Sequence, residues 1–248
     1  NVQETRTGLG GIQPSQSDYW QATKALGHGD FQILVFAPST VQEMVDLVSD
    51  AFDKADEYRM PAMILADGML GQMMEPVELP EHKDRKLPEK PWAACGHENK
   101  REHNIINSLY LTPNALEDLV RARYERYKIV EEKEQRAEEY RTEDADVIVV
   151  AYGASSRVAR SAVNKAREAG KKVGLIRPIT LWPFPKDAIK RAADHAKELL
   201  VVEMSMGQMV DDVRLAAECR VPVHFYGRTG GVIPTPKEIL GEIDKLLK

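Results

Sequence analysis

A glycine-rich run near the start of the chain is the first feature that could do chemistry. Its sequence is Gly8-Leu9-Gly10-Gly11-Ile12-Gln13-Pro14-Ser15-Gln16. Glycine lets the backbone approach a ligand closely, and in α/β proteins such a loop follows the carboxyl end of a strand. Only residues 1–3 precede the run as a strand candidate, and there is no initiator Met. We therefore expect the chain to begin inside a domain, beside a site that is only partly present.

Four further clusters of glycine and polar residues follow predicted strands. They are Asp67-Gly68, residues 153–156, residues 205–208 and residues 227–231, the last of which contains Arg228. Ligands of open α/β sheets bind beyond the carboxyl ends of strands, so each cluster is a candidate site. For Asp67 and residues 153–156 we favour a strand-end turn and a helix cap, whereas anion binding and a tight turn are equally open for Arg228. No Walker A loop, dinucleotide-binding fingerprint or Gly-x-Ser-x-Gly elbow is present.

The two cysteines give little indication of a metal centre. Cys95 lies near His97 and His103, but this spacing lacks a second close pair of zinc ligands, so we favour a loop cysteine. With Cys95 and Cys219 as its only cysteines, the chain has no disulfide framework and fits a reducing compartment. An iron–sulfur cluster usually requires four thiolates, so we expect this chain alone to hold none.

The composition is that of a globular protein with one large domain or two ordinary ones. Hydrophobic residues make up 43% and charged residues 29% of the 248 positions. The formal net charge of −5 argues against nucleic acid as the main partner. No apolar run is long enough to cross a bilayer and no signal peptide is visible, so we expect a cytoplasmic protein without membrane contact.

The elements that must position the candidate residues begin with a strand–helix–strand unit. Residues 31–37 and 61–66 are short apolar runs, as strands buried on both faces require. Between them, apolar residues recur at helical spacing and predict one buried stripe, formed by Val41, Met44, Val45, Val48, Ala51 and Phe52. The short turns on either side predict a parallel crossover.

The middle of the chain differs from its flanks. Residues 75–114 place several prolines among charged and weakly apolar residues, which predicts an extended connection. Residues 115–140 are dense in Glu, Arg and Lys with interleaved apolar residues. We expect them to form a long, largely exposed helix whose acidic end is solvated.

A second α/β unit begins at residue 146. Apolar runs predict strands at residues 147–153, 172–176, 199–204 and 221–226. Helices are predicted beside them at residues 155–170, 185–197, 207–218 and 236–247. The alternation indicates a compact doubly wound domain, so the prediction is two α/β domains of which the first is incomplete.

Long collinear motifs resemble the α subunit of 2-oxoacid:ferredoxin oxidoreductases. They lie at residues 8–19, 64–76, 175–185, 202–209 and 227–231. The segments Gly-Gln-Met-Met-Glu-Pro (residues 71–76) and Pro-Ser-Gln-Ser-Asp-Tyr (residues 14–19) most resemble the branch that acts on branched-chain 2-oxoacids such as 3-methyl-2-oxobutanoate. The resemblance covers essentially the whole chain.

The resemblance implies an incomplete pyrimidine-type thiamine-binding α/β domain followed by a transketolase C-terminal-like α/β domain. We assign residues 1–75 to the first, residues 76–145 to an extended connection with a charged helix, and residues 146–248 to the second. Members of the family decarboxylate a 2-oxoacid on thiamine diphosphate, reduce ferredoxin through iron–sulfur clusters and transfer the acyl group to coenzyme A. The implied partners are a β subunit that holds the diphosphate and Mg²⁺, a γ subunit and a ferredoxin-like δ subunit with the clusters.

The resemblance also implies roles for individual residues. The family's catalytic glutamate would lie upstream of Asn1, so none of the residues present is assigned as catalytic and we predict an isolated chain without turnover. Arg6, Gly8, Gly10 and Gly11 would bind substrate, although the family arginine registers on Glu4 and Arg6 lies two positions later. Asp67, Gly68 and Arg228 would face the cofactor or a subunit interface.

Three other functions stay open at this point. The chain could be a non-catalytic assembly module whose charged helix and C-terminal domain dock other subunits. It could be a relative specific for 2-oxoglutarate or pyruvate. A transketolase-type enzyme acting on sugar phosphates is less favoured, because that chemistry calls for several phosphate-binding Arg or His residues and only Arg228 qualifies.

Overall fold

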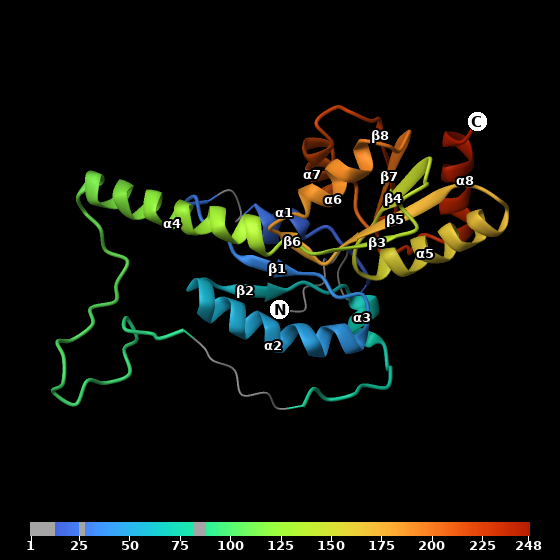
Figure 1. Cartoon of the computed structure of the whole chain (residues 1–248). Coiled ribbons are helices and arrows are strands. Elements are labelled where there is room, and N and C mark those ends of the chain that lie inside the picture. The colour runs from blue at the N-terminus through green and yellow to red at the C-terminus, as the bar shows by residue number, and fades with distance from the viewer. Residues whose placement is uncertain (1–12, 25–27, 82–87) are drawn as a thin grey trace.

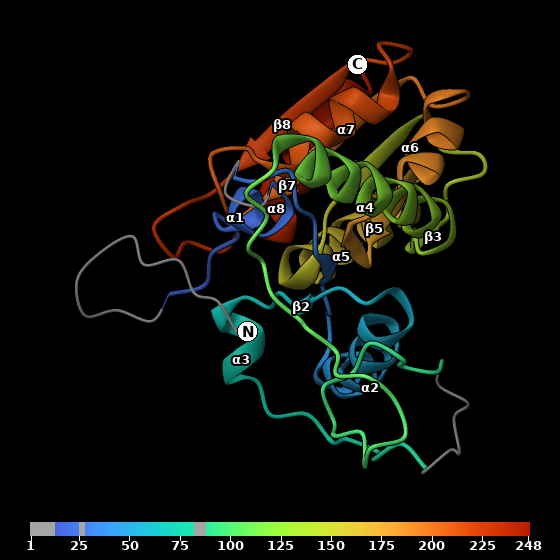
Figure 2. The ribbon, with the colours of Figure 1, turned by 90° about the vertical axis from the view of Figure 1, so that its left-hand side faces the viewer.

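The computed structural model describes residues 13–24, 28–81 and 88–248. Within them the chain forms two β-sheets with helices packed against both (Figure 1). A long helix and an arm of irregular backbone extend away from this body (Figures 1 and 2).

The smaller sheet has the strand order β2-β1-β6. β1 (Leu34–Phe36) and β2 (Ala62–Ile64) are parallel and are joined by α2 (Val41–Tyr58), so the predicted crossover is confirmed. Thr40 precedes α2 in an extended conformation and accepts a hydrogen bond from the Glu43 N–H, as a helix N-cap does.

The third strand of this sheet comes from the other half of the chain. β6 (Thr180–Trp182) runs antiparallel to β1, and beside it the Ala37 N–H donates to the Ile179 carbonyl. The sequence analysis did not predict β6, because three residues are too few to carry a periodic pattern. Since β6 completes a sheet of the first half, the division into residues 1–75, 76–145 and 146–248 stays a prediction.

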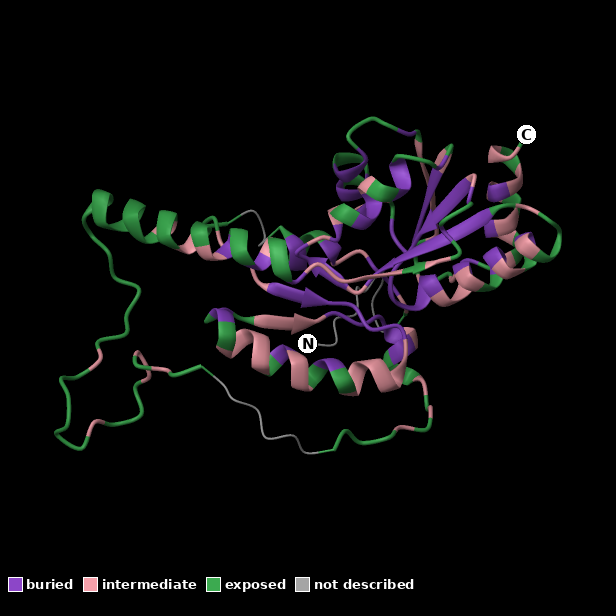
Figure 3. Ribbon diagram, in the orientation of Figure 1, coloured by how far each residue is buried: buried purple, intermediate pink, exposed green. Residues whose placement is uncertain are grey.

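The larger sheet has the order β3-β5-β4-β7-β8 and is parallel except for β3 (Ala137–Tyr140) at one edge. The parallel strands are β4 (Val147–Val150), β5 (Val173–Pro178), β7 (Glu198–Glu203) and β8 (Val223–Gly227). One face is covered by α5 (Gly153–Glu168) and α8 (Pro236–Leu246), the other by α6 (Lys186–Ala193) and α7 (Met209–Ala217). The central strands are therefore buried on both faces (Figure 3), and the predicted doubly wound domain is confirmed.

The long helix ends earlier than predicted. α4 spans Pro113–Lys133, and the last part of the predicted helix 115–140 forms β3 instead. Strand pairing overrides helix propensity at residues 137–140, because β3 completes the edge of the sheet beside β5. The prediction of a solvated acidic end is wrong at Glu134, which is buried and accepts a hydrogen bond from the Tyr58 hydroxyl.

The apolar stripe of α2 is only partly covered. Leu47, Ala51 and Tyr58 are buried, whereas Val48 and Phe52 are exposed, Phe52 by 73%. The prediction of one buried stripe is therefore wrong at these two positions. The face of α2 that contains Leu47, rather than the middle of the predicted stripe, packs toward the smaller sheet.

The arm leaves the body after α3 (Gly68–Gln72) and returns through α4 (Figures 1 and 2). It is fastened beside the end of α2, where Lys90 pairs with Asp56 at 2.5 Å and the Arg59 guanidinium lies over the Trp92 ring. The arm therefore has a fixed attachment to the smaller sheet's helix.

The later part of the arm is apolar and uncharged, yet exposed. Residues 104–116 contain no Asp, Glu, Lys or Arg. Large apolar side chains there face solvent, namely Ile105, Ile106, Leu109, Tyr110, Leu111 and Leu116. We call this stretch the apolar arm.

The helices give no sign of a membrane span. Across residues 13–24, 28–81 and 88–248, each helix is too short or too polar to cross a bilayer.

Two glycines of the larger domain provide a test of its packing. A Cβ on Gly174 in β5 would lie 2.7 Å from the Arg141 carbonyl oxygen, which is backbone that cannot swing away. We expect Gly174→Ala to lower the free energy of unfolding by about 1–3 kcal/mol. A Cβ on Gly241 in α8 meets nothing within 4 Å, so Gly241→Ala should raise stability by about 0.5–1 kcal/mol. Urea denaturation followed by circular dichroism measures both, and a Gly174→Ala variant as stable as the parent would contradict the packing described.

Candidate functional site

The carboxyl ends of the parallel strands meet at one edge of the larger sheet. From β4 the chain crosses through α5 to β5 on one side, and from β7 it crosses through α7 to β8 on the other. The gap between β4 and β7 is therefore the point where the strand order reverses. In open α/β sheets this is the place where ligands bind.

Gln16 occupies this gap. Its side-chain Nε2 donates to the Tyr152 carbonyl at 2.9 Å, and its Oε1 accepts from the Met204 N–H at 2.9 Å and from the Ser155 hydroxyl at 3.0 Å. Its own N–H donates to the Met204 carbonyl and its carbonyl accepts from the Tyr152 hydroxyl. With only 5% of its surface exposed, Gln16, the last residue of the glycine-rich run, joins residues 13–18 to the ends of β4 and β7.

Two glycines make this close approach possible. Gly153 has a φ of +55°, and a Cβ there would lie 3.2 Å from both Gln16 Nε2 and Asp67 Oδ2. Gly231 has a φ of +88°, and a Cβ there would lie 2.6 Å from the side chain of Gln13. Gly153 and Gly231 thus leave room for neighbouring segments of the same chain, because a Cβ at either position would collide with them.

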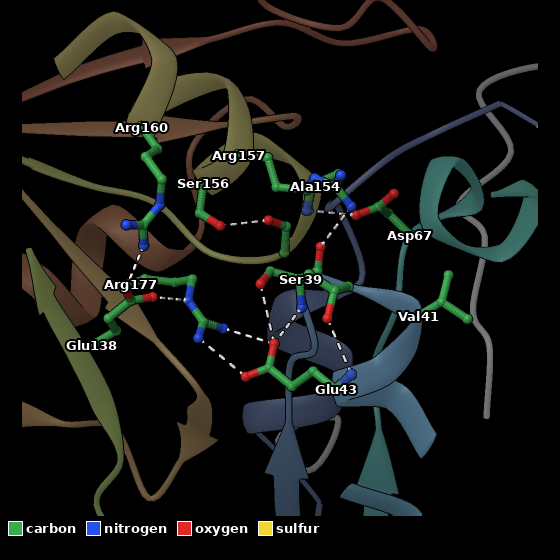
Figure 4. A network of polar contacts seen from close by, with 12 residues as sticks. Ser39, Val41, Glu43, Asp67, Glu138, Ala154, Ser156, Arg157, Arg160 and Arg177 are labelled. Atoms are coloured by element: carbon green, nitrogen blue, oxygen red, sulfur yellow. Dashed lines mark hydrogen bonds and ion pairs between the residues drawn. The ribbon is translucent and has the colours of Figure 1, made fainter. Parts of the chain in front are cut away.

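Asp67 links the end of β2 to the start of α5. One carboxylate oxygen accepts from the Leu70 N–H at 3.1 Å and caps α3, and the other accepts from the Ala154 N–H at 3.0 Å (Figure 4). Burial raises the pKa of this carboxyl, and the backbone hydrogen bonds oppose that rise. The structure therefore places Asp67 at the junction of the two sheets.

Segment 13–24 is held by the larger domain along its whole length. The Tyr19 hydroxyl, in α1 (Tyr19–Thr23), donates to the Asp212 carboxylate of α7 at 2.5 Å. Burial and the Asp212 carboxylate raise the pKa of Tyr19 well above its ordinary value. The Gln208 side chain accepts from the Trp20 N–H at 2.8 Å, which adds a second tie to the β7–α7 turn.

Glu203 is a residue that the sequence analysis missed. It ends β7, is fully buried, and its carboxylate accepts hydrogen bonds at 3.0–3.3 Å from the Ser205 hydroxyl and from the N–H groups of Gln208, Met209 and Val210. Burial raises its pKa and these donors oppose the rise. A carboxylate at the end of an apolar strand, two residues before the start of a Ser-Met-Gly-Gln turn, is the signal that could have found it.

A recess lies where these pieces meet. Its lining comes from residues 15–18, the end of β2 and the β4–α5 turn, and consists of Ser15, Gln16, Asp18, Leu65, Ala66, Asp67, Tyr152 and Gly153. Partial burial raises the pKa of Asp18. The recess offers carboxylate and hydroxyl groups beside an apolar wall, and its described lining includes no Lys or Arg.

A network of ion pairs holds the smaller sheet's helix against the larger domain (Figure 4). Arg177 of β5 is buried and contacts both oxygens of Glu43 at 2.9 and 3.0 Å, and its Nε donates to Glu138 at 2.9 Å. Arg157 of α5 pairs with Glu75 at 2.8 Å. These contacts fix the orientation of α2 relative to the site.

Of the other candidate residues, the structure describes Arg228 and Gly68, and both have structural roles. Arg228 pairs with Glu238, which also forms the capping box at the start of α8, and Gly68 is the buried first residue of α3. Arg6, Gly8, Gly10 and Gly11 lie outside the described residues.

Metal ligands are likewise sparse in the described structure. The rings of His97 and His103 lie 4.1 Å apart, but across the described residues no group of three or more His, Cys, Asp or Glu side chains could hold a metal ion.

Comparisons with known proteins now assign the chain. Residues 5–148, more than half of it, match the family described as pyruvate flavodoxin/ferredoxin oxidoreductase, thiamine diphosphate-binding. The chain belongs to the 2-oxoacid:ferredoxin oxidoreductase family. Residues 145–239 match pyruvate:ferredoxin oxidoreductase core domain II. The predicted family is confirmed, and the transketolase-type alternative is not supported.

Two relatives are similar to this oxidoreductase subunit over most of its length. It is 46% identical to the ketoisovalerate oxidoreductase subunit VorB of Methanothermobacter marburgensis over 246 residues, which are 99% of this chain and 69% of that protein. It is 34% identical to the 2-oxoglutarate synthase subunit KorA of the same organism, over 92% of this chain and 68% of that protein.

The fold agrees with a solved structure. The 2-oxoglutarate:ferredoxin oxidoreductase of Magnetococcus marinus, solved with 2-oxoglutarate, coenzyme A and succinyl-CoA, superposes with a TM-score of 0.81 at 22% identity. The match covers all of this chain and 48% of that one, so this chain spans about half its length. The predicted thiamine-binding domain followed by a transketolase C-terminal-like domain is confirmed as the fold class.

Asp67 provides a test of the junction in this oxidoreductase subunit. Asn in its place keeps one acceptor but turns an amide NH₂ toward a second backbone N–H, so Asp67→Asn should cost about 1–3 kcal/mol of stability at neutral pH. Asp211→Asn, at an exposed position of α7, is the control and should cost less than about 0.5 kcal/mol.

The cost should also depend on pH. Because the folded pKa of Asp67 lies above its ordinary value of 3.8, the folded protein binds this proton more tightly than the unfolded chain. The part of the folding stability that is linked to this proton is therefore fully present below the unfolded pKa and is lost as pH rises through the folded pKa. The parent's advantage over Asp67→Asn should be larger at about pH 4.5 than at about pH 7 in urea titrations. An advantage that shrinks on acidification would contradict a raised pKa.

Proposed function

We propose that the chain is the α-type subunit of a thiamine-diphosphate-dependent oxidoreductase that converts a branched-chain 2-oxoacid to its acyl-CoA and reduces ferredoxin. The observation that carries the substrate class is the 46% identity to VorB over 99% of the chain, against 34% to KorA over 92%. This difference favours 3-methyl-2-oxobutanoate over 2-oxoglutarate as the substrate.

The described residues fit one half of thiamine diphosphate better than the other. The recess at the junction combines the Asp18 and Asp67 carboxylates with an apolar wall from Leu65 and Tyr152, groups that suit the edge of an uncharged aminopyrimidine ring, but in this chain alone it has room for about one water molecule, so the ring's site would have to be completed by a partner subunit. Its described lining has no cation for a diphosphate, and the described residues offer no group of carboxylates for Mg²⁺. When bound, the cofactor supplies the electron sink that decarboxylation of a 2-oxoacid requires.

Partner subunits then supply what the described part of this chain does not. We assign the diphosphate and Mg²⁺ to a thiamine-binding β subunit, and the iron–sulfur clusters to γ and ferredoxin-like δ subunits. Two cysteines, Cys95 and Cys219, both exposed, support this division, because a cluster usually needs four thiolates. The free cysteines and a ferredoxin acceptor also support a cytoplasmic location.

The roles of the glycine-rich run stay part of this proposal. Arg6, Gly8, Gly10 and Gly11 are proposed to contact the substrate, and Asp67 and Gly68 to face the cofactor side of the junction. Arg228 is better suited to the β8–α8 turn than to a ligand, because its guanidinium already pairs with Glu238.

A second candidate role, in assembly of the complex, is favoured by the apolar arm. Exposed apolar patches without charge usually mark protein–protein contacts. We propose that residues 104–116 contact a partner subunit in the complex, whether or not the chain also contributes to catalysis.

The substrate is tested with the full protein reconstituted with its partner subunits. We expect reduction of a viologen dye with 3-methyl-2-oxobutanoate, thiamine diphosphate and coenzyme A, at a kcat/KM about tenfold or more above that for 2-oxoglutarate or pyruvate. A reversed preference would support the 2-oxoglutarate- or pyruvate-specific alternative. Absence of turnover with all three acids would refute the catalytic proposal.

The apolar arm is tested with a double variant. Leu109→Asp combined with Leu111→Asp places charges on side chains that are 71% and 83% exposed, so the fold should be unaffected. Recovery of the partner subunits by co-purification should fall about tenfold or more. Leu215→Asp, at a 74% exposed position of α7, is the matched control and should assemble normally. Normal assembly of the double variant would exclude the arm as a contact.

A further inference from the structure

One carboxylate of the recess makes no bond to the rest of the described chain. Asp18 stands immediately before α1, a position from which an Asp side chain commonly accepts from an N–H of the first helical turn. Its φ of −99° and ψ of 10° are not the extended conformation that such capping uses, and its side chain forms no cap. Among the described residues no hydrogen bond or ion pair reaches this carboxylate, and burial alone raises its pKa. Asp18 therefore brings an unused acceptor to the recess that it lines.

The bond that Asp18 does not make is made by Gln208. The Gln208 carboxamide accepts from the Trp20 N–H at 2.8 Å, a group that an Asp18 cap would serve, and donates to the Ser17 carbonyl at 2.7 Å. It thus holds the main chain both before and after Asp18. We infer that Gln208 is a positioning residue that keeps the Asp18 carboxylate free for the donor group of a ligand in the recess. The inference rests on the proposed function, in which that donor is the amino group of the aminopyrimidine ring.

The turn that carries Gln208 is itself fixed by a buried carboxylate. The Gln208 N–H donates to the two oxygens of Glu203 at 3.2 and 3.3 Å. The Ser205 hydroxyl donates to Glu203 at 3.0 Å and accepts from the Gly207 N–H at 3.1 Å. The Gln208 side chain therefore extends from a turn whose main chain is bonded at several points, which a positioning role requires.

Loss of the Gln208 carboxamide should redirect the Asp18 carboxylate rather than release the segment. The Tyr19 hydroxyl still donates to Asp212 at 2.5 Å, so α1 stays on α7. The Trp20 N–H would then lack its acceptor, and the Asp18 carboxylate, at the N-cap position, is the local group that can replace it. A carboxylate drawn into that bond no longer serves a ligand.

The test measures binding of thiamine diphosphate by isothermal titration calorimetry, with the full protein in its reconstituted, cofactor-free complex and with Mg²⁺ present. We expect Asp18→Ala to raise the Kd about tenfold, and Asp18→Asn, which keeps a neutral acceptor, about threefold. Gln208→Met keeps the length of the side chain without its two hydrogen bonds and should raise the Kd about fivefold. Because Gln208 acts through Asp18, adding Gln208→Met to Asp18→Ala should change the Kd by less than about twofold.

An analogue tests the proposed donor group. Oxythiamine diphosphate carries an oxygen in place of the ring's amino group, so the parent complex should bind it about tenfold less tightly than thiamine diphosphate. Asp18→Ala should lose most of this preference, because the acceptor that distinguishes the two rings is gone. An unchanged preference in Asp18→Ala would overturn the inference.

Gln42→Met is the matched control, since Gln42 makes its hydrogen bonds at the surface of α2, to Asp46 and Glu78. Its Kd should equal that of the parent. Where Gln208→Met does not assemble with its partners, Asp18→Ala against Asp18→Asn and the analogue decide. A Kd of Asp18→Ala or of assembled Gln208→Met within about twofold of the parent, or effects that multiply in the double variant, would overturn the inference. A parent complex that does not bind thiamine diphosphate would overturn the proposed function, and the inference with it.

Discussion

The hydrogen bonds that join segment 13–18 to the main chain just beyond β4 and β7 are the constraint on which the junction depends. A buried main-chain carbonyl or N–H without a partner is costly, and water has no access once segment 13–18 lies across the strand ends. The Gln16 side chain bonds to main-chain groups just beyond both strands: it accepts from the Met204 N–H and donates to the Tyr152 carbonyl, which also accepts from the Ser155 hydroxyl and the Ser156 N–H. Gly153 and Gly231 lack a Cβ for the same reason, because any side chain there would push the segment away from the groups that it must reach.

Further contacts join the two halves beside this segment. β6 pairs with β1, and the N-terminal end of α2 meets β3, β5 and α5. Arg177 and Arg157 then face Glu43 and Glu75 across the boundary. Ion pairs that are partly buried hold such a boundary in one orientation, and they depend on the apolar and hydrogen-bonded contacts that bring them together.

The sequence predicted the parts of the fold that depend on local pattern. Apolar runs identified β4, β5, β7 and β8, and the glycine and polar clusters at their ends indeed converge at one edge. What could not be predicted depends on tertiary pairing. β3 is a strand only because β5 lies beside it, β6 is too short to show a period, and Gln16 looks like any polar loop residue until the strand ends around it are known. The family motifs identified the protein's relatives, whereas the recess and the buried Glu203 required coordinates.

The apolar arm has a consequence for the amount of this chain that a cell should make relative to its partner subunits. Uncovered Ile and Leu side chains on an arm fastened in place are a standing liability for self-association while the chain waits for its proposed partner. Surplus copies would be lost to aggregation or to proteolysis, so the scarcest subunit would set the amount of finished enzyme. Synthesis of the subunits in matched amounts, rather than greater stability of this one, would then limit the loss of surplus copies.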